Sequence, residues 1–233
     1  MSQTPADAER VASEPDVLTS SPRSVTALVE SPIGDPAPLG LAGFAMTTVL
    51  LSLVNAGVIG GSAVNAVLPL ALCYGGGAQL LAGMWEFRNR NTFGGLAFSS
   101  YGAFWISFYV LIRWWAPSTA GATNDALGFF LLMWGIFTLY MFIASFGTNV
   151  AVMLVFFSLT VTFFVLAASY FGGQTGGYFQ VKEVAGYCGL VTGALAWYTS
   201  FAGVLNATWK RVVLPVGPLT RTAPLPATRR AAA

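Results

Sequence analysis

The sequence predicts an all-α membrane protein, folded as a bundle of six transmembrane helices. Of its 233 residues, 55% are hydrophobic and 9% are charged, whereas a soluble domain carries about 25% charged residues. The charges are also segregated, because only seven of the twenty charged residues lie between Leu39 and Leu205. That interval contains six apolar runs, which are too long and too continuously apolar for the alternating strands of a β-barrel.

Each run is long enough to cross a bilayer as a helix, for which about 20 apolar residues suffice. The runs are Leu39–Ile59, Ala66–Trp85, Leu96–Trp115, Ala126–Phe146, Val150–Phe171 and Gly186–Leu205. We expect residues 34–214 to form one six-span domain. Residues 1–33 are acidic, rich in Ser, Pro and Ala, and without the apolar core of a signal peptide, so we expect a disordered N-terminal tail. Residues 215–233 predict a disordered basic tail.

The distribution of Lys and Arg predicts the orientation of the spans. With six spans, both tails lie on the same side of the membrane as the loops after the second and fourth spans. The basic residues on that side are Arg23, Arg88, Arg90, Lys210, Arg211 and Arg221. The opposite side has Arg113 and Lys182. Because cytoplasmic loops are enriched in basic residues, we expect a multi-pass protein of the cell membrane, plasma or inner, with both termini in the cytoplasm.

The composition argues against several functional classes. The chain has no histidine, which excludes histidine acid–base chemistry and histidine metal ligands. Cys73 and Cys188 lie in apolar runs without metal-binding spacing, so we expect two buried thiols and no metal or other cofactor. A net charge of +2 without a concentrated basic patch gives no reason to expect a nucleic-acid partner. No arrangement of catalytic residues and no nucleotide-binding loop indicates an enzyme.

The stretch GDPAPLGLAGF, residues 34–44, predicts a sharply defined start of the first helix. The first N–H groups of a helix have no partner within the helix. Asp35 can accept from them, and its charge suits the positive end of the helix. Pro36 and Pro38 then fall in the first turn, where proline sacrifices no hydrogen bond. Gly40 allows a neighbouring helix to approach closely.

Polar side chains recur within the spans, and they are expensive in lipid unless they face the bundle or a wet cavity. Phe44, Thr47, Thr48, Leu51 and Asn55 share one face of the first span. The residues that are candidates for lining a pathway are Thr47, Thr48, Asn55, Gln79, Ser99, Ser100 and Thr162. Two interpretations stay open for them: structural hydrogen bonds, including bonds of Ser and Thr to their own helix, or a lined pathway.

Glu86 lies at the end of the second span, beside Arg88 and Arg90. It is a candidate for an interfacial ion pair or for a proton site. No lysine or arginine lies at mid-membrane. A fixed cation there would trap an anion, whereas conduction requires binding weak enough for release.

The opening stretch is also a signature. The sequence Asp35-Pro36-Ala37-Pro38-Leu39-Gly40-Leu41 resembles the Asn-Pro-Ala-Pro-Leu-Gly-Leu motif of the acetate uptake transporter family, also called succinate–acetate permeases. Further similar stretches are GFAMTTVLLSLVNAG (43–57), YGGGAQLLAGMWEFRNRNTFGGLAFSSYGAFW (74–105), WGIFTLYMF (134–142), VFFSLTVTFFVLA (155–167) and WKRVVLPVG (209–217). The resemblance thus covers roughly residues 34–217. One residue departs from the motif, because Asp35 stands where the family has Asn.

The resemblance implies a six-helix protomer that assembles in the lipid bilayer as a homohexamer, with a separate pathway through each protomer. It implies transport of acetate and, in some members, succinate, and protons are candidate co-substrates. It also implies a hydrophobic constriction midway along the pathway. The residues that match this constriction are Phe44, Tyr101 and Leu159.

Three other functions compete with this interpretation. The same scaffold can move ammonium or another small solute. A membrane-embedded enzyme is a second alternative, which no cluster of catalytic residues supports. A structural or regulatory membrane protein is the third, and the presence of the whole motif set argues against it.

Overall fold

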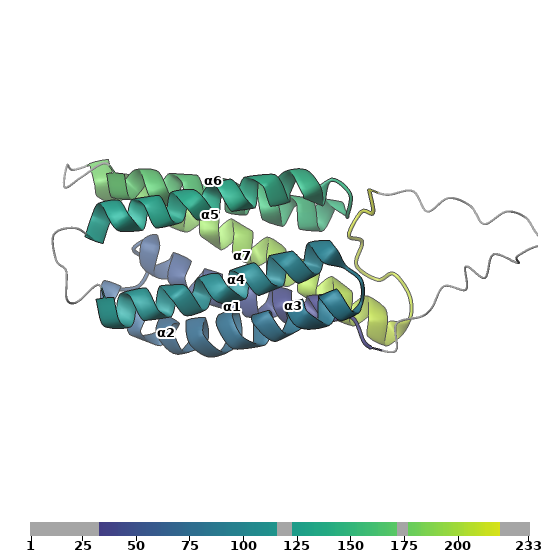
Figure 1. Cartoon of the computed structure of the whole chain (residues 1–233). Coiled ribbons are helices and arrows are strands. Elements are labelled where there is room, and N and C mark those ends of the chain that lie inside the picture. The colour runs from purple at the N-terminus through teal and green to yellow at the C-terminus, as the bar shows by residue number, and fades with distance from the viewer. Residues whose placement is uncertain (1–32, 116–122, 172–176, 220–233) are drawn as a thin grey trace, which may run out of the picture. The chain divides into compact units, whose positions relative to one another are not determined.

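The computed structural model describes residues 33–115, 123–171 and 177–219, and helices make up nearly all of this part (Figure 1). Six helical stretches are long and apolar enough to cross a membrane. They are Ala37–Asn55, Gly61–Arg88, Thr92–Trp114, Asn124–Ser145, Val150–Phe171 and Gln180–Trp209. The prediction of an all-α protein with six spans is therefore confirmed. Residues 1–32 of the expected tail 1–33 and residues 220–233 of the expected tail 215–233 lie outside the described residues.

Four spans are single helices and two contain other helical turns. The single helices are α1 (Ala37–Asn55), α5 (Thr123–Ser145), α6 (Val150–Phe171) and α7 (Gly177–Trp209). The second span consists of a 3₁₀ turn (Gly61–Ala63), α2 (Val64–Leu72), a π-helical segment (Cys73–Ala78) and α3 (Gln79–Arg88). The third is α4 (Thr92–Val110), which continues as a π-helical turn (Leu111–Trp115). Pro69 lies inside α2, and the missing N–H of an interior proline disturbs the regular hydrogen-bond ladder.

The first helix starts as the proline-rich stretch predicts, one residue later than expected. Asp35 Oδ1 accepts a hydrogen bond from the Ala37 N–H at 2.9 Å. Pro36 occupies the cap position and Pro38 lies within the first turn. Because neither proline has an N–H to leave unpaired, the chain turns into the helix without losing a hydrogen bond.

Glycines allow the helices to pack with their backbones close together. The main helix pairs are α1 with α7, α5 with α6, α6 with α7, and α3 with α4. A Cβ on Gly43 would lie 2.6 Å from the backbone oxygen of Tyr74 in the π-helical segment. A Cβ on Gly102 of α4 would lie 2.7 Å from the backbone nitrogen of Leu80 in α3. Larger residues at these two positions would therefore force the spans apart.

The two ends of the bundle carry different segments. The start of α1 and the end of α7 lie at one end, and the end of α1 and the start of α7 lie at the other (Figure 1). At the first end, residues 215–219 pack on the turn before α6, where the Val150 N–H donates to the Gly217 carbonyl at 2.8 Å and the Leu219 N–H donates to the Thr148 carbonyl at 3.0 Å. These residues belong to the predicted basic tail 215–233, whereas in the structure they pack against the bundle.

Candidate functional site

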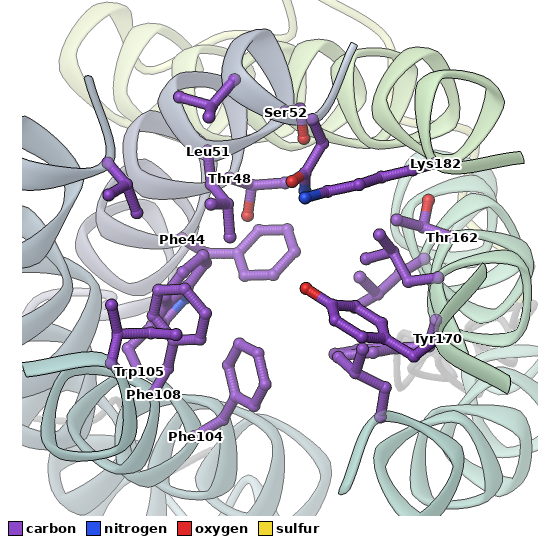
Figure 2. Close-up of a pocket in the computed structure, with 18 of the residues that line it drawn as sticks. Phe44, Thr48, Leu51, Ser52, Phe104, Trp105, Phe108, Thr162, Tyr170 and Lys182 are labelled. Carbon is purple, nitrogen blue, oxygen red and sulfur yellow. The ribbon is translucent and has the colours of Figure 1, made fainter. Parts of the chain in front are cut away.

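A cavity of about 280 Å³ lies inside the bundle (Figure 2). Side chains from α1, α2, α4, α5, α6 and α7 form its wall. Along α1 the wall runs from Asn55, the last residue of the helix, to Phe44 near its middle. At about 1.5 Å per residue this is roughly 16 Å, about half the thickness of a bilayer core. Lys182 on α7 lies at the same end of the bundle as Asn55.

The inner end of the cavity meets the three residues predicted to form a constriction. Phe44, Tyr101 and Leu159 belong to one buried cluster, with exposed fractions of 5%, 3% and 4%. Phe44 and Leu159 line the cavity directly. Tyr101 packs behind Phe44, with 5.9 Å between the ring centroids. The structure thus brings together side chains from the first, third and fifth spans, as the resemblance implies, but Tyr101 is not among the residues that line the cavity.

The Tyr101 hydroxyl is occupied by another helix. It forms a hydrogen bond of 2.9 Å with Thr138 Oγ1 on α5. Thr138 Oγ1 also donates to the Trp134 carbonyl at 2.7 Å. Because a threonine hydroxyl has a single proton, Tyr101 must be the donor to Thr138. In this arrangement the hydroxyl joins α4 to α5 and has no proton left for a carboxylate.

Five buried side-chain atoms have no hydrogen-bond partner in the described part of the chain, and two of them are Thr48 Oγ1 and Trp105 Nε1. Both residues line the cavity (Figure 2). Buried polar groups are almost always hydrogen-bonded, and leaving one unpaired costs about 1–3 kcal/mol. Each atom is itself buried, so a rotation of its side chain would be needed to bring it into contact with a molecule in the cavity.

Thr48, Asn55 and Thr162 are the sequence candidates that the structure places on the cavity wall. The Thr162 hydroxyl donates to the Ser158 carbonyl at 2.8 Å and lies 3.3 Å from Thr192 Oγ1. Its proton is therefore used within the protein. Of the three, only Thr48 has a side chain that is both buried and unpartnered.

The remaining candidates lie away from the cavity wall. The Thr47 hydroxyl donates to the Gly43 carbonyl at 2.9 Å, which is the bond to its own helix that the sequence analysis left open. Gln79 and Ser99 are not among the lining residues, although each has a buried polar atom without a partner in the described part of the chain. Ser100 lines a separate surface pocket beside Trp134.

Glu86 has a different partner from the arginines that its sequence position suggests. Its exposed fraction is 2%, and its Oε2 accepts a hydrogen bond of 2.8 Å from Asn91 Nδ2. Asn91 also caps α4, because its Oδ1 accepts from the Gly94 N–H at 3.1 Å. Arg88 and Arg90 are exposed. Glu86 therefore ties the end of the second span to the start of the third.

Sequence reasoning missed most of the wall, including Trp105, Tyr170 and Lys182. Trp105 and Tyr170 lie in apolar runs, where nothing in the pattern separates a cavity-facing ring from a lipid-facing one. Lys182 precedes the predicted sixth run, which we placed at Gly186–Leu205. In the structure α7 begins at Gly177, so Lys182 lies on the helix. A helix frequently extends beyond its apolar run, and a test for such an extension would have found this residue.

Comparisons with known proteins agree with this architecture. A family model described as the GPR1/FUN34/yaaH family matches residues 18–221. The succinate-acetate/proton symporter SatP of Escherichia coli (strain K12) is 41% identical over 186 residues, which cover 79% of this chain and 96% of SatP. The ammonia transport outward protein 2 of Saccharomyces cerevisiae is 40% identical over 176 residues, which cover 73% of this chain and 61% of that protein.

A solved structure of the bacterial acetate channel SatP is also similar. It is 40% identical in sequence and matches with a TM-score of 0.72 over 79% of this chain and 99% of that chain. The family consists of membrane transporters and channels rather than enzymes. With six membrane helices and a family match over most of its length, this chain belongs to the GPR1/FUN34/yaaH family, the acetate uptake transporters.

Proposed function

We propose that this protein moves acetate and related short carboxylates, succinate among them, through the cavity of each protomer. The observation that carries this proposal is the pairing of apolar walls with two unpartnered polar groups, Thr48 Oγ1 and Trp105 Nε1–H. A carboxylate that leaves water needs hydrogen-bond donors, and an aliphatic stem tolerates aromatic and aliphatic walls. Neutral donors suit a transported anion, because they bind it weakly enough for release.

Phe44, Tyr101 and Leu159 act as a hydrophobic constriction in this proposal. Their burial in one cluster at the inner end of the cavity supports it. An apolar constriction excludes water and hydrated ions by dewetting. Tyr101 supports the Phe44 ring from behind, and its bond to Thr138 fixes α4 against α5 at this depth.

The proposed assembly is a homohexamer with both termini in the cytoplasm, so that the cavity faces the opposite side. The Lys and Arg distribution supports the orientation. Large exposed apolar side chains such as Leu81 and Trp85 on α3 are available to contact lipid or a neighbouring protomer. Native mass spectrometry measures the number of chains, and labelling of cysteines introduced at each terminus measures the orientation.

Purified protein in liposomes tests the proposed substrate. We expect uptake of labelled acetate, inhibition by unlabelled short carboxylates, and no uptake in protein-free liposomes. The rate is compared with and without a pH gradient, because a proton-coupled transporter responds to the gradient and an uncoupled channel does not. Absence of acetate movement under both conditions would reject the proposal.

Ammonium is the second candidate substrate, and the name of the yeast relative is the observation that favours it. Uptake of labelled methylammonium by the same liposomes separates the two. A cation must pass the Lys182 amine in the cavity wall, which disfavours its entry. We therefore expect acetate uptake to exceed methylammonium uptake.

A further inference from the structure

Lys182 brings a positive charge into the wall of the cavity. The side chain is half-buried, and its amine lies 5.9 Å from the centroid of the Tyr170 ring. Figure 2 shows Lys182 extending from α7 across the cavity toward the α1 wall that carries Thr48 and Ser52. The charge thus lies in the space that a solute must cross, beyond the mid-membrane constriction.

No carboxylate within the described residues neutralises this charge. The residues that line the cavity include neither Asp nor Glu, and Lys182 forms no ion pair with a residue that the structure describes. Glu183 follows directly in the sequence but is exposed and does not line the cavity. The Glu183 carboxylate lies beside the loop after α1, because its Oε1 is 3.7 Å from the position that a Cβ on Gly57 would occupy.

We infer that Lys182 is a carboxylate-binding residue at the outer mouth of the cavity, which captures the anionic form of the substrate and disfavours cations. This inference rests on the proposed function and assigns it a specific charged subsite. An amine on a flexible stem attracts a carboxylate as a point charge, without the two-point clamp of an arginine. The anion is therefore concentrated at the mouth and can still pass inward to Thr48 and Trp105.

The position of Lys182 reconciles a fixed cation with conduction. A cation at the constriction would hold the anion where water is excluded and electrostatic attraction is strongest. Lys182 is on α7 at the end of the bundle that holds Asn55, away from the constriction at Phe44. Ring contact with Tyr170 positions the amine at the wall.

The test compares Lys182→Gln, Lys182→Met and Lys182→Arg with the unchanged protein, and uses Lys210→Gln as a matched control. Lys210 is exposed beyond the opposite end of α7 and does not line the cavity. We expect the two neutral variants to raise the KM for acetate uptake from the outer face about tenfold, the worth of one charge-assisted hydrogen bond. Lys182→Arg keeps the charge and should not raise the KM, and Lys210→Gln should keep the KM within about twofold of the unchanged protein.

Salt dependence gives a second readout that a merely structural role of Lys182 would not move. Screening weakens the attraction of a partly exposed charge. The KM of the unchanged protein should rise with ionic strength, and the KM of the neutral variants should respond little. Size-exclusion profiles verify that each variant is folded. If Lys182→Gln fails this check, Lys182→Met keeps the length of the stem and carries the comparison.

Binding of acetate in detergent, followed through ligand-observed NMR of its methyl group, separates this inference from the proposed function. If acetate binding weakens in Lys182→Gln but the unchanged protein transports no acetate, the proposed function is rejected and the Lys182 subsite is supported. Transport with an unchanged KM and unchanged binding in both neutral variants would reject the subsite and leave the function intact. If the unchanged protein neither binds nor transports acetate, both the subsite and the proposed function are rejected.

Discussion

Of the three residues proposed to form the constriction, Leu159 has the simplest role, because it offers only an aliphatic wall. It is buried and lines the cavity on α6. Leu159→Ala should widen the passage and admit larger acids such as lactate or succinate, since truncation removes a steric barrier without adding charge. The measurement is uptake of a panel of labelled acids in liposomes.

The control for Leu159→Ala is Leu154→Ala, on the same helix but exposed. Truncation of a buried leucine costs about 2–5 kcal/mol, so rates are normalised to the amount of folded protein. An unchanged range of acids in the Leu159 variant, at a normal protein level, would remove this residue from the proposed filter.

Thr48 and Thr47 are adjacent in the sequence and differ in what their hydroxyls contact. Thr47 donates to the Gly43 carbonyl, whereas the Thr48 hydroxyl is unpartnered at the cavity wall. Thr48→Val should raise the KM for acetate at least about tenfold, because a hydrogen bond to a charged group contributes about 1.5–3 kcal/mol. The matched variant Thr47→Val should leave the KM unchanged. Equal KM values for the two variants would contradict the assignment of Thr48 as a substrate contact.

At the scale of the elements, the close approach of α1 to the π-helical segment controls where Phe44 lies. Gly43 precedes Phe44, and the backbone oxygen of Tyr74 occupies the space that a Cβ would need. Gly43→Ala should destabilise the fold by about 1–3 kcal/mol, because a backbone atom cannot move aside as a flexible side chain does. Gly60→Ala is the control, since nothing lies within 4 Å of its added Cβ.

Thermal stability in detergent measures the effect of Gly43→Ala, as the temperature at which half of the protein remains monodisperse. A loss confined to Gly43→Ala is the expected result. If Gly43→Ala and Gly60→Ala were equally stable, the contact between α1 and the π-helical segment would be looser than described.

For the whole molecule, the sequence was sufficient to predict six helical spans, because hydropathy responds to total apolar length. It did not predict which polar residues meet in the cavity. Thr47 and Thr48 point in directions about 100° apart around α1, and both side chains are buried. Which of the two faces the cavity depends on how the neighbouring helices pack, and the sequence does not specify this. Lys182 precedes the predicted run Gly186–Leu205, although α7 begins at Gly177 and includes it. The roles of Phe44, Tyr101 and Leu159 came from the family resemblance rather than from the residue pattern.

Asp35 places a negative charge at the end of the bundle opposite Lys182. Asp35 is exposed at the start of α1, and the helix of 19 residues separates it from the cavity mouth. This is roughly 27 Å, several times the Debye length of about 8 Å at physiological salt. Asp35→Asn should therefore leave uptake through the Lys182 mouth unchanged, and it should act only on acetate that enters from the Asp35 end, which is cytoplasmic in the proposed orientation.

The size of this effect follows from the charge removed. A unit charge about 8 Å from an acetate ion in water contributes about 0.5 kcal/mol, or slightly more than a twofold change in local concentration. Efflux from acetate-loaded vesicles of Asp35→Asn should rise by about this factor at low salt and return to the unchanged rate as salt increases. Stability should change by only about 0.3–1 kcal/mol, because Asn also accepts from the first-turn N–H groups. Identical efflux at every salt concentration would leave Asp35 with the capping bond to Ala37 as its whole role.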